Sequence, residues 1–215
     1  MMKIKWVIIL SIVSIILLTC LMAGPLMSNV EQPNYQVIKS EQDFDIREYI
    51  PMITAEVKVQ GERDEAIGKG FRILADYIFG NNTIQQKITM TASAEHISNE
   101  KIAMTAPVQQ QSQNGIWKIS FVMPSKYQMH SLPKPNNVSV MINQVPKKRY
   151  VVTKFSGWNS NENIEKHEKL LMKYIKENHI KTFGLPTYAF YNPPWTLPFM
   201  RRNEIMFEIE NISKN

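Results

Sequence analysis

The residues best suited to binding a ligand lie in the closing part of the chain. They combine two arginines with two aromatic side chains and are Tyr191, Trp195, Arg201 and Arg202. A guanidinium group binds a carboxylate through paired hydrogen bonds, and the aromatic faces can stack on a flat ring. In the alternative interpretation one arginine pairs with Glu204 or Glu48 and fixes the last strand. Three prolines, Pro193, Pro194 and Pro198, make this run stiff under either interpretation.

Motifs that would support catalysis are absent from the sequence. It contains no glycine-rich phosphate loop, no His-Glu-x-x-His and no Gly-x-Ser-x-Gly. The only cysteine is Cys20, so the rest of the chain has no thiolate for catalysis or metal binding and no internal disulfide. We therefore predict a binding protein rather than an enzyme.

Composition and charge indicate one globular domain with an N-terminal appendage. The 215 residues are 44% hydrophobic and 20% charged, which is an ordinary globular balance. The net charge of +6 is spread along the chain, with its densest cluster at Lys147–Arg149 and no basic stripe interleaved with aromatic residues. We expect no nucleic-acid partner.

The first 28 residues differ from the rest of the chain. No charged residue occurs from Trp6 to Met27, while Lys3 and Lys5 precede this run. Its length favours a membrane anchor over a signal-peptide core, and the two lysines predict that the chain beyond it is exported. We expect residues 1–28 to form the anchor or signal segment, 29–34 a linker, and 35–215 the folded domain.

Two alternatives for this segment keep the same exported localisation. Cys20 follows Leu17, Leu18 and Thr19, which loosely resembles a lipoprotein cleavage box, although the threonine weakens the match. Cleavage after Ala23 would instead release a soluble domain.

Past the linker, the order strand, helix, strand, strand occurs twice. The first pass is predicted at residues 52–59, 63–79, 101–108 and 117–123, and the second at residues 149–155, 161–178, 188–191 and 204–209. A near copy of the third element occurs at residues 87–93, so two Met-Thr segments stand side by side in the sequence. Each predicted helix has one apolar stripe, which indicates that both lie on a sheet.

Two such halves predict an α+β domain in which a mostly antiparallel, curved sheet carries two helices and leaves a groove between the halves. The 13 Met, 9 Phe, 8 Tyr and 4 Trp are the apolar lining that such a ligand groove needs. Gly68 and Gly70 fall inside the first helix, where each costs about 1 kcal/mol relative to Ala. Close approach of another backbone or a ligand would explain them, as would simple tolerance by the surrounding packing.

Several uncommon short sequence motifs occur in an order that resembles the SOUL haem-binding family. They are Phe44–Tyr49, Tyr77–Asn82, Lys101–Val108, Phe121–Tyr127 and Tyr191–Glu204, within a similarity that covers Tyr35 to Glu210. The resemblance implies a distorted, mostly antiparallel β-barrel of two strand-helix-strand-strand repeats, related to GyrI-like effector-binding domains. It also implies binding of haem or another tetrapyrrole, and the doubled Met-Thr segment is similar to bacterial members.

A haem protein needs an apolar slot, cations near the propionates and often an axial donor to iron. Arg201 and Arg202 would pair with the propionates, and Trp195 and Tyr191 would stack on the macrocycle. His167 borders the apolar stripe of the second helix and is our candidate metal ligand, with a structural histidine as the alternative. Met104 and Met90 are further donors, although a strand methionine usually belongs to the core.

The remaining histidines, His96, His130 and His179, are expected in loops or at a helix end, where they are usually solvated. Axial coordination is therefore weak or absent in our reading. We predict a membrane-tethered binder of haem or a related porphyrin, acting as carrier, buffer or sensor. The alternatives are an envelope scaffold that presents its proline-rich rim to a protein partner, and a hydrolase of GyrI-like type using Glu48 or Glu204 as base.

Overall fold

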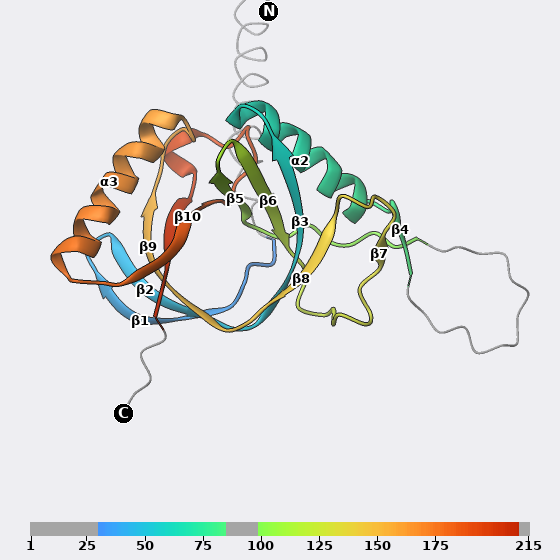
Figure 1. The fold of residues 1–215 in the computed structure, drawn as a ribbon, viewed down its shortest axis with the longest axis horizontal. Coiled ribbons are helices and arrows are strands. Elements are labelled where there is room, and N and C mark those ends of the chain that lie inside the picture. Colours follow the sequence, from blue (N-terminus) through green and yellow to red (C-terminus); the bar gives the residue numbers. More distant parts are fainter. Residues whose placement is uncertain (1–29, 85–98, 211–215) are drawn as a thin grey trace, which may run out of the picture.

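A computed structural model describes residues 30–84 and 99–210 of the chain. In this part the chain forms a curled nine-stranded antiparallel sheet that carries two helices (Figure 1). The large sheet and its helices are β1 (Tyr35–Glu41), β2 (Phe44–Tyr49), β3 (Met52–Gln60), α2 (Arg63–Ile78), β5 (Val108–Gln113), β6 (Ile116–Val122), β8 (Met141–Val145), β9 (Lys148–Phe155), α3 (Asn161–Glu177), β10 (Thr182–Phe190) and β11 (Asn203–Ile209). A small second sheet pairs β4 (Asn82–Thr83) with β7 (Lys134–Pro135), and η1 (Pro198–Met200) is a 3-10 turn.

The predicted order of elements is confirmed as β3-α2-β5-β6 followed by β9-α3-β10-β11, although β5 begins only where the predicted third strand ends, at Val108. The strand order β1-β2-β9-β11-β10-β5-β6-β3-β8 places the two halves side by side, joined where β10 pairs with β5. Each half also includes a strand that leads directly into the other half: β2, which pairs with β9, continues through Ile50 and Pro51 into β3, and β8, which pairs with β3, continues through Pro146 and Lys147 into β9. The α+β, half-barrel architecture agrees with the prediction.

Alternation along the strands separates the two faces of the sheet, because successive side chains point to opposite sides. In β3, Ala55, Val57 and Val59 join the core under α2, while Thr54 and Glu56 line the opposite face. The other half follows the same rule. In β11 the core residues under α3 are Ile205, Phe207 and Ile209, and the opposite face carries Met206 and Glu208.

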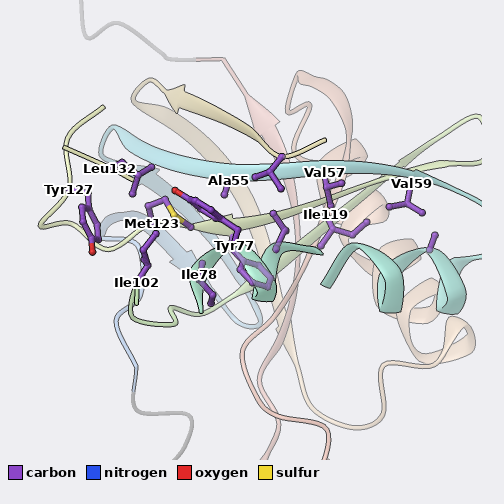
Figure 2. Packing of buried hydrophobic residues seen from close by; sticks show 14 residues of the cluster. Ala55, Val57, Val59, Tyr77, Ile78, Ile102, Ile119, Met123, Tyr127 and Leu132 are labelled. Atoms are coloured by element: carbon purple, nitrogen blue, oxygen red, sulfur yellow. The ribbon is translucent and has the colours of Figure 1, made fainter. Parts of the chain in front are cut away.

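Each helix closes its own hydrophobic core. Figure 2 shows the first core, in which side chains of α2 meet those of β3, β6 and the segment after β6. The second core joins α3 to β9 and β11. The two cores are separate clusters, one under each helix. The space between the halves is therefore lined by side chains that belong to neither core.

The helix boundaries follow the sequence signals closely. Both helices end one residue before the predicted position, and Ser160 caps α3 by accepting a hydrogen bond from the Asn163 amide. Gly70 is required by close approach, since a Cβ at this position would lie 2.6 Å from Cδ1 of Ile119. Gly68 has no such constraint, because its nearest neighbour would be Arg72 Nη1 at 3.6 Å.

The prediction of a strand over Lys101–Val108 is wrong. Residues 101–107 lie outside any strand, and β5 begins at Val108. The amides of this segment bond elsewhere: Ile102 N donates to the Ile78 carbonyl at the end of α2, and Ala106 N donates to the Glu31 carbonyl. Burial in this segment does not alternate: Ile102 is buried and so are Thr105, Ala106 and Pro107 in succession. Thr105 Oγ1 donates to the Val122 carbonyl at the end of β6, so the side chain rather than a backbone ladder makes the contact.

Several predictions concern residues outside the described ranges. These are the anchor at Trp6–Met27 with Cys20 and Ala23, the first Met-Thr copy at residues 87–93 with Met90, and His96. Within residues 30–84 and 99–210, no helix has the length and apolar character needed to cross a membrane.

Candidate functional site

A cleft of about 220 Å³ lies between the two halves of the sheet, on the face away from the helices. Its lining is mainly polar and includes Thr54, Glu56, Gln109, Gln110, Gln111, Lys118, Ser120, Lys148 and Glu208, with Tyr49, Tyr150, Phe183 and Leu185 among the apolar contacts. The predicted groove was apolar. The difference arises because the apolar side chains of β3, β6, β9 and β11 face the helices, and the alternate positions face the cleft.

Three of the four charged side chains that line the cleft, Glu56, Lys148 and Glu208, have polar partners nearby. Lys148 Nζ lies 2.6 Å from Glu208 Oε2. Glu56 accepts hydrogen bonds from Thr54 Oγ1 at 3.0 Å and from Asn143 Nδ2 at 2.9 Å. These pairs make the cleft suited to a small polar molecule rather than to a large apolar one.

Glu204 on β11 is fully buried and is the centre of a charged network. Its Oε1 accepts from Arg47 Nη1 and from Arg202 Nε, each at 2.9 Å, and its Oε2 accepts from Tyr191 Oη at 2.7 Å. Burial raises the pKa of Tyr191, and the nearby Glu204 charge adds to the effect. The network connects β2 to the start and end of the segment between β10 and β11.

A second hollow, of about 470 Å³, lies where the β2–β3 link meets the segment after β6. We call it the methionine groove after Met52, Met123 and Met129, and its other apolar lining residues are Pro33, Ile50, Pro51, Ile53, Val122 and Pro124. Pockets for drug-sized ligands are about 300–1,000 Å³. The methionine groove falls in this range and the cleft between the halves does not.

Hydrogen bonds fix the wall of the methionine groove. Met123 N donates to the Ile53 carbonyl at 2.8 Å, and Ser125 N donates to Glu31 Oε1 at 2.7 Å. Tyr127 Oη donates to Glu100 Oε1 at 2.5 Å. The groove is therefore formed by backbone held at both ends rather than by a free loop.

Two side chains at the rim of this groove have the chemistry of iron ligands. His130 and Met129 both line it, and both are exposed. Sequence reasoning placed His130 in a solvated loop and did not connect it to a groove. The signal that could have found it is the local density of Met123, Met129 and His130, but Met52 on β3 joins them only through the fold.

The residues predicted from the closing run do not line either hollow. Tyr191 and Arg202 belong to the Glu204 network, where Arg202 Nη2 lies 2.7 Å from Glu204 Oε1. The structural alternative for this arginine is thus the one found. Arg201 is buried and donates to the carbonyl oxygens of Thr196 and Pro194, while Trp195 is exposed.

Two of the three predicted iron donors, Met104 and His167, lie in the described residues, and both have packing roles. Met104 packs against the first core. His167 Nδ1 lies 2.7 Å from the Asn163 carbonyl oxygen, one turn earlier in α3, and the ring stacks on Phe155 with centroids 4.2 Å apart. His167 thus lies between α3 and β9, outside the lining of the cleft and of the groove.

The carboxylates proposed as catalytic bases are both in ion pairs. Hydrogen bonds from Lys147 and Arg149 lower the pKa of Glu48, so it is a weaker base than an ordinary glutamate. Glu204 is bound by two arginines and a tyrosine, as described above. Within the described ranges, no three His, Cys, Asp or Glu side chains gather in a way that could hold a metal ion.

Comparison with known proteins gives a family and a fold. A family model described as SOUL heme-binding protein matches residues 30–208. No curated protein matches significantly. The crystal structure of the EcmrR C-terminal domain is similar at a TM-score of 0.58 and 12% identity, covering 83% of this chain and 99% of that one. A hydrolase from Listeria innocua is similar at a TM-score of 0.51 and 8% identity, covering 80% and 94%. At these identities the likeness concerns the fold alone.

Proposed function

Because the chain belongs to the SOUL haem-binding protein family, we propose that it binds haem or a related tetrapyrrole, and that the macrocycle lies in the methionine groove. The observation that carries this proposal is the size and lining of the groove. At about 470 Å³ it is larger than the cleft between the halves and similar in size to a more open hollow of about 480 Å³ beside α3. Its apolar lining comes from methionine, isoleucine, proline and valine side chains, and polar groups make up the rest. Methionine adapts its shape to flat apolar ligands because its side chain is unbranched and polarisable.

The polar groups around the groove fit the remaining requirements of haem. His130 and Met129 are of the types that ligate haem iron. Lys126, between the lining residues Ser125 and Tyr127, is a candidate partner for a propionate. When bound, haem would supply an iron centre that takes up an axial ligand or an electron. The chain itself would supply enclosure and orientation of the ring.

The cellular role that we propose is that of a carrier, buffer or sensor tethered to the membrane through residues 1–28, with the domain exported. This tether rests on the uncharged run Trp6–Met27 and the preceding lysines. Two exposed groups at an open groove favour exchange of the ligand over permanent retention, since an exposed axial donor can be displaced by another protein's donor.

The test is a Soret titration of the full-length chain in non-ionic detergent, with empty micelles as the blank. We expect saturable binding of ferric haem and of metal-free porphyrin, because enclosure rather than iron coordination supplies most of the affinity. Absence of saturable binding for both ligands would contradict the proposal and leave the alternative of an interaction domain.

Two histidine variants locate the iron. We expect His130→Ala to change the ferric spectrum while leaving porphyrin binding intact. His167→Ala is the matched control, since this histidine packs on Phe155 away from the groove. The opposite pattern, a spectral change only in His167→Ala, would show that the iron lies at α3 and that the groove assignment is wrong.

A further inference from the structure

An exposed apolar cluster at one end of the sheet is not used by the proposed haem site. It consists of Trp158, Trp195, Phe199 and Met200, whose exposed fractions are 60%, 56%, 73% and 39%. We call these four side chains the aromatic rim. Large exposed apolar groups that gather in one place usually mark a binding surface.

The aromatic rim is rigid, because hydrogen bonds join the two segments that form it. The Gly157 amide donates to the Pro198 carbonyl at 2.8 Å, and Asn203 Nδ2 donates to the Gly157 carbonyl at 3.1 Å. The Arg201 guanidinium lies 4.4 Å from the centre of the Trp158 ring and donates to the Thr196 carbonyl at 2.7 Å. The surface is therefore preformed, so little ordering of side chains opposes binding.

The same two segments lack charge. Residues 155–161 and 190–200 contain no Asp, Glu, Lys or Arg, and the adjoining Arg201 is buried. A surface of this kind can enter the interfacial region of a bilayer without removing a charged group from water. Tryptophan is enriched in that region because its ring is apolar and its N–H can still bond to water or headgroups.

The position of Val30 indicates which surface the rim meets. Val30 packs against a cluster that contains Tyr191, and Gln32 Oε1 accepts a hydrogen bond from Arg202 Nη1 at 3.0 Å. Tyr191 and Arg202 are the two ends of the segment that carries Trp195, Phe199 and Met200. The N-terminal part of the described chain is thus fixed beside the base of the rim.

The uncharged run Trp6–Met27 ends only three residues before Val30. Three residues span at most about 11 Å, at up to about 3.6 Å per residue, so a tether in this run would be joined to the domain by a short connection. Building on the membrane tether proposed above, we propose that the aromatic rim rests on the same lipid surface. The tether alone would allow the domain to tumble, whereas the rim adds a second contact that fixes its orientation.

Charge near the rim selects the lipid. Arg63 Nη1 bonds to the Asn159 carbonyl at 3.1 Å, which places the first turn of α2 beside Trp158. The first turns of α2 and α3 carry Asp64, Glu65 and Glu162. These three carboxylates outnumber the one cation in the two turns, Arg63, which pairs with Asp64 at 3.5 Å. The charge beside the rim is therefore not one that attracts an anionic surface, so the contact is apolar and does not require acidic lipid.

Fluorescence quenching in vesicles tests this proposal. The full-length chain is reconstituted in phosphatidylcholine vesicles with Trp6→Phe, Trp117→Phe and Trp158→Phe, so that Trp195 is the only tryptophan. We expect lipids brominated near the headgroup end of the acyl chain to quench Trp195 at least twofold. The control keeps Trp117 on β6 as the only tryptophan, and we expect bromolipid to leave it unquenched.

A second variant keeps the test decisive. Phe199 is 73% exposed, so Phe199→Asp should leave the fold intact, which far-UV circular dichroism verifies. In vesicles this change should roughly double the quenching of Trp195 by aqueous acrylamide. Equal acrylamide quenching with and without Phe199→Asp, together with no bromolipid quenching, would overturn the proposal. Protection of Trp195 that disappears on dilution in detergent would also overturn it, because the rim would then bind a second copy of the chain.

Discussion

Arg47 on β2 and Glu204 on β11 form a buried ion pair across the intervening strand β9, with Nη1 and Oε1 2.9 Å apart, although the two residues are 157 positions apart in the sequence. Although burial works against the charge of Arg47, the Glu204 carboxylate raises the pKa of its guanidinium. The pair joins an early strand to the closing motif and sits between the cleft and the base of the aromatic rim. The network therefore has a structural role: it holds β2 against β11 and against the segment between β10 and β11.

Removal of Arg47 should destabilise the protein strongly. Arg47→Met leaves Glu204 and Asp45 without one of their partners, and breaking one side of a buried pair costs about 3–5 kcal/mol in the free energy of unfolding. Urea denaturation followed by far-UV circular dichroism measures this change. Lys169→Met is the control, because its pair with Glu165 is exposed and should contribute less than about 0.5 kcal/mol. Similar losses in the two variants would show that the buried pair has no special role.

The two glycines of α2 should respond in opposite directions to alanine. At Gly70 the new Cβ would lie 2.6 Å from Cδ1 and 2.9 Å from Cγ1 of Ile119, so the cost of overpacking, about 1–3 kcal/mol, exceeds the gain in helix propensity. At Gly68 the gain of about 1 kcal/mol should remain, because the nearest atom is 3.6 Å away. Thermal unfolding should give a lower midpoint for Gly70→Ala and a higher one for Gly68→Ala.

A double variant checks the cause at Gly70. Ile119→Val removes the Cδ1 atom that the alanine would meet, so Gly70→Ala should cost less in that background than in the parent. If the two changes are simply additive, close approach to Ile119 is not the reason for the glycine.

Alkaline pH should unfold the protein through its tyrosines. Burial is the main cause that raises the pKa of Tyr49 to about 12, and it also raises the pKa values of Tyr77, Tyr150, Tyr188 and Tyr191. Unfolded tyrosines have a pKa of about 10. The folded state therefore binds more protons above this pH, so the resulting stability is complete below pH 10 and is lost as pH rises through about 12.

Absorbance at 295 nm follows tyrosine ionisation directly. We expect these five buried or half-buried tyrosines to ionise in one cooperative step that coincides with loss of the circular dichroism signal. Gradual ionisation of all eight tyrosines near pH 10, with the signal intact, would contradict their burial.

Much of the fold is visible in the sequence because it depends on local periodicity. The apolar stripe of α3 and the cap at Ser160 define a helix without reference to the rest of the chain. Ile102 and Thr105 show where such reasoning stops. Ile102 is buried as an alternating strand would require, but Thr105, three positions further on, is buried out of phase with it. The amide of Ile102 bonds to the end of α2, and no local signal distinguishes that partner from a neighbouring strand.

The site was less predictable because its residues come together only in three dimensions. The closing run is rich in arginine and aromatic residues, yet Arg202 and Tyr191 are turned inward to Glu204. Met52 and His130 lie 78 positions apart in the numbering, and only the return of the chain after β6 places both at one groove. The alternation of apolar and polar residues in β3 and β6 indicates that each strand has one polar face. It does not indicate that this face lines a cleft, because that depends on which face of the sheet the helices cover.

The central claim is that the methionine groove, and not the cleft between the halves, holds the tetrapyrrole. Gln144 lines the groove and Gln111 lines the cleft, so Gln144→Trp and Gln111→Trp place the same bulky side chain in each hollow. Soret titration with ferric haem should show affinity reduced about tenfold or more in Gln144→Trp, roughly 1.4 kcal/mol, and little changed in Gln111→Trp. Loss of affinity in Gln111→Trp alone, or in neither variant, would contradict the account.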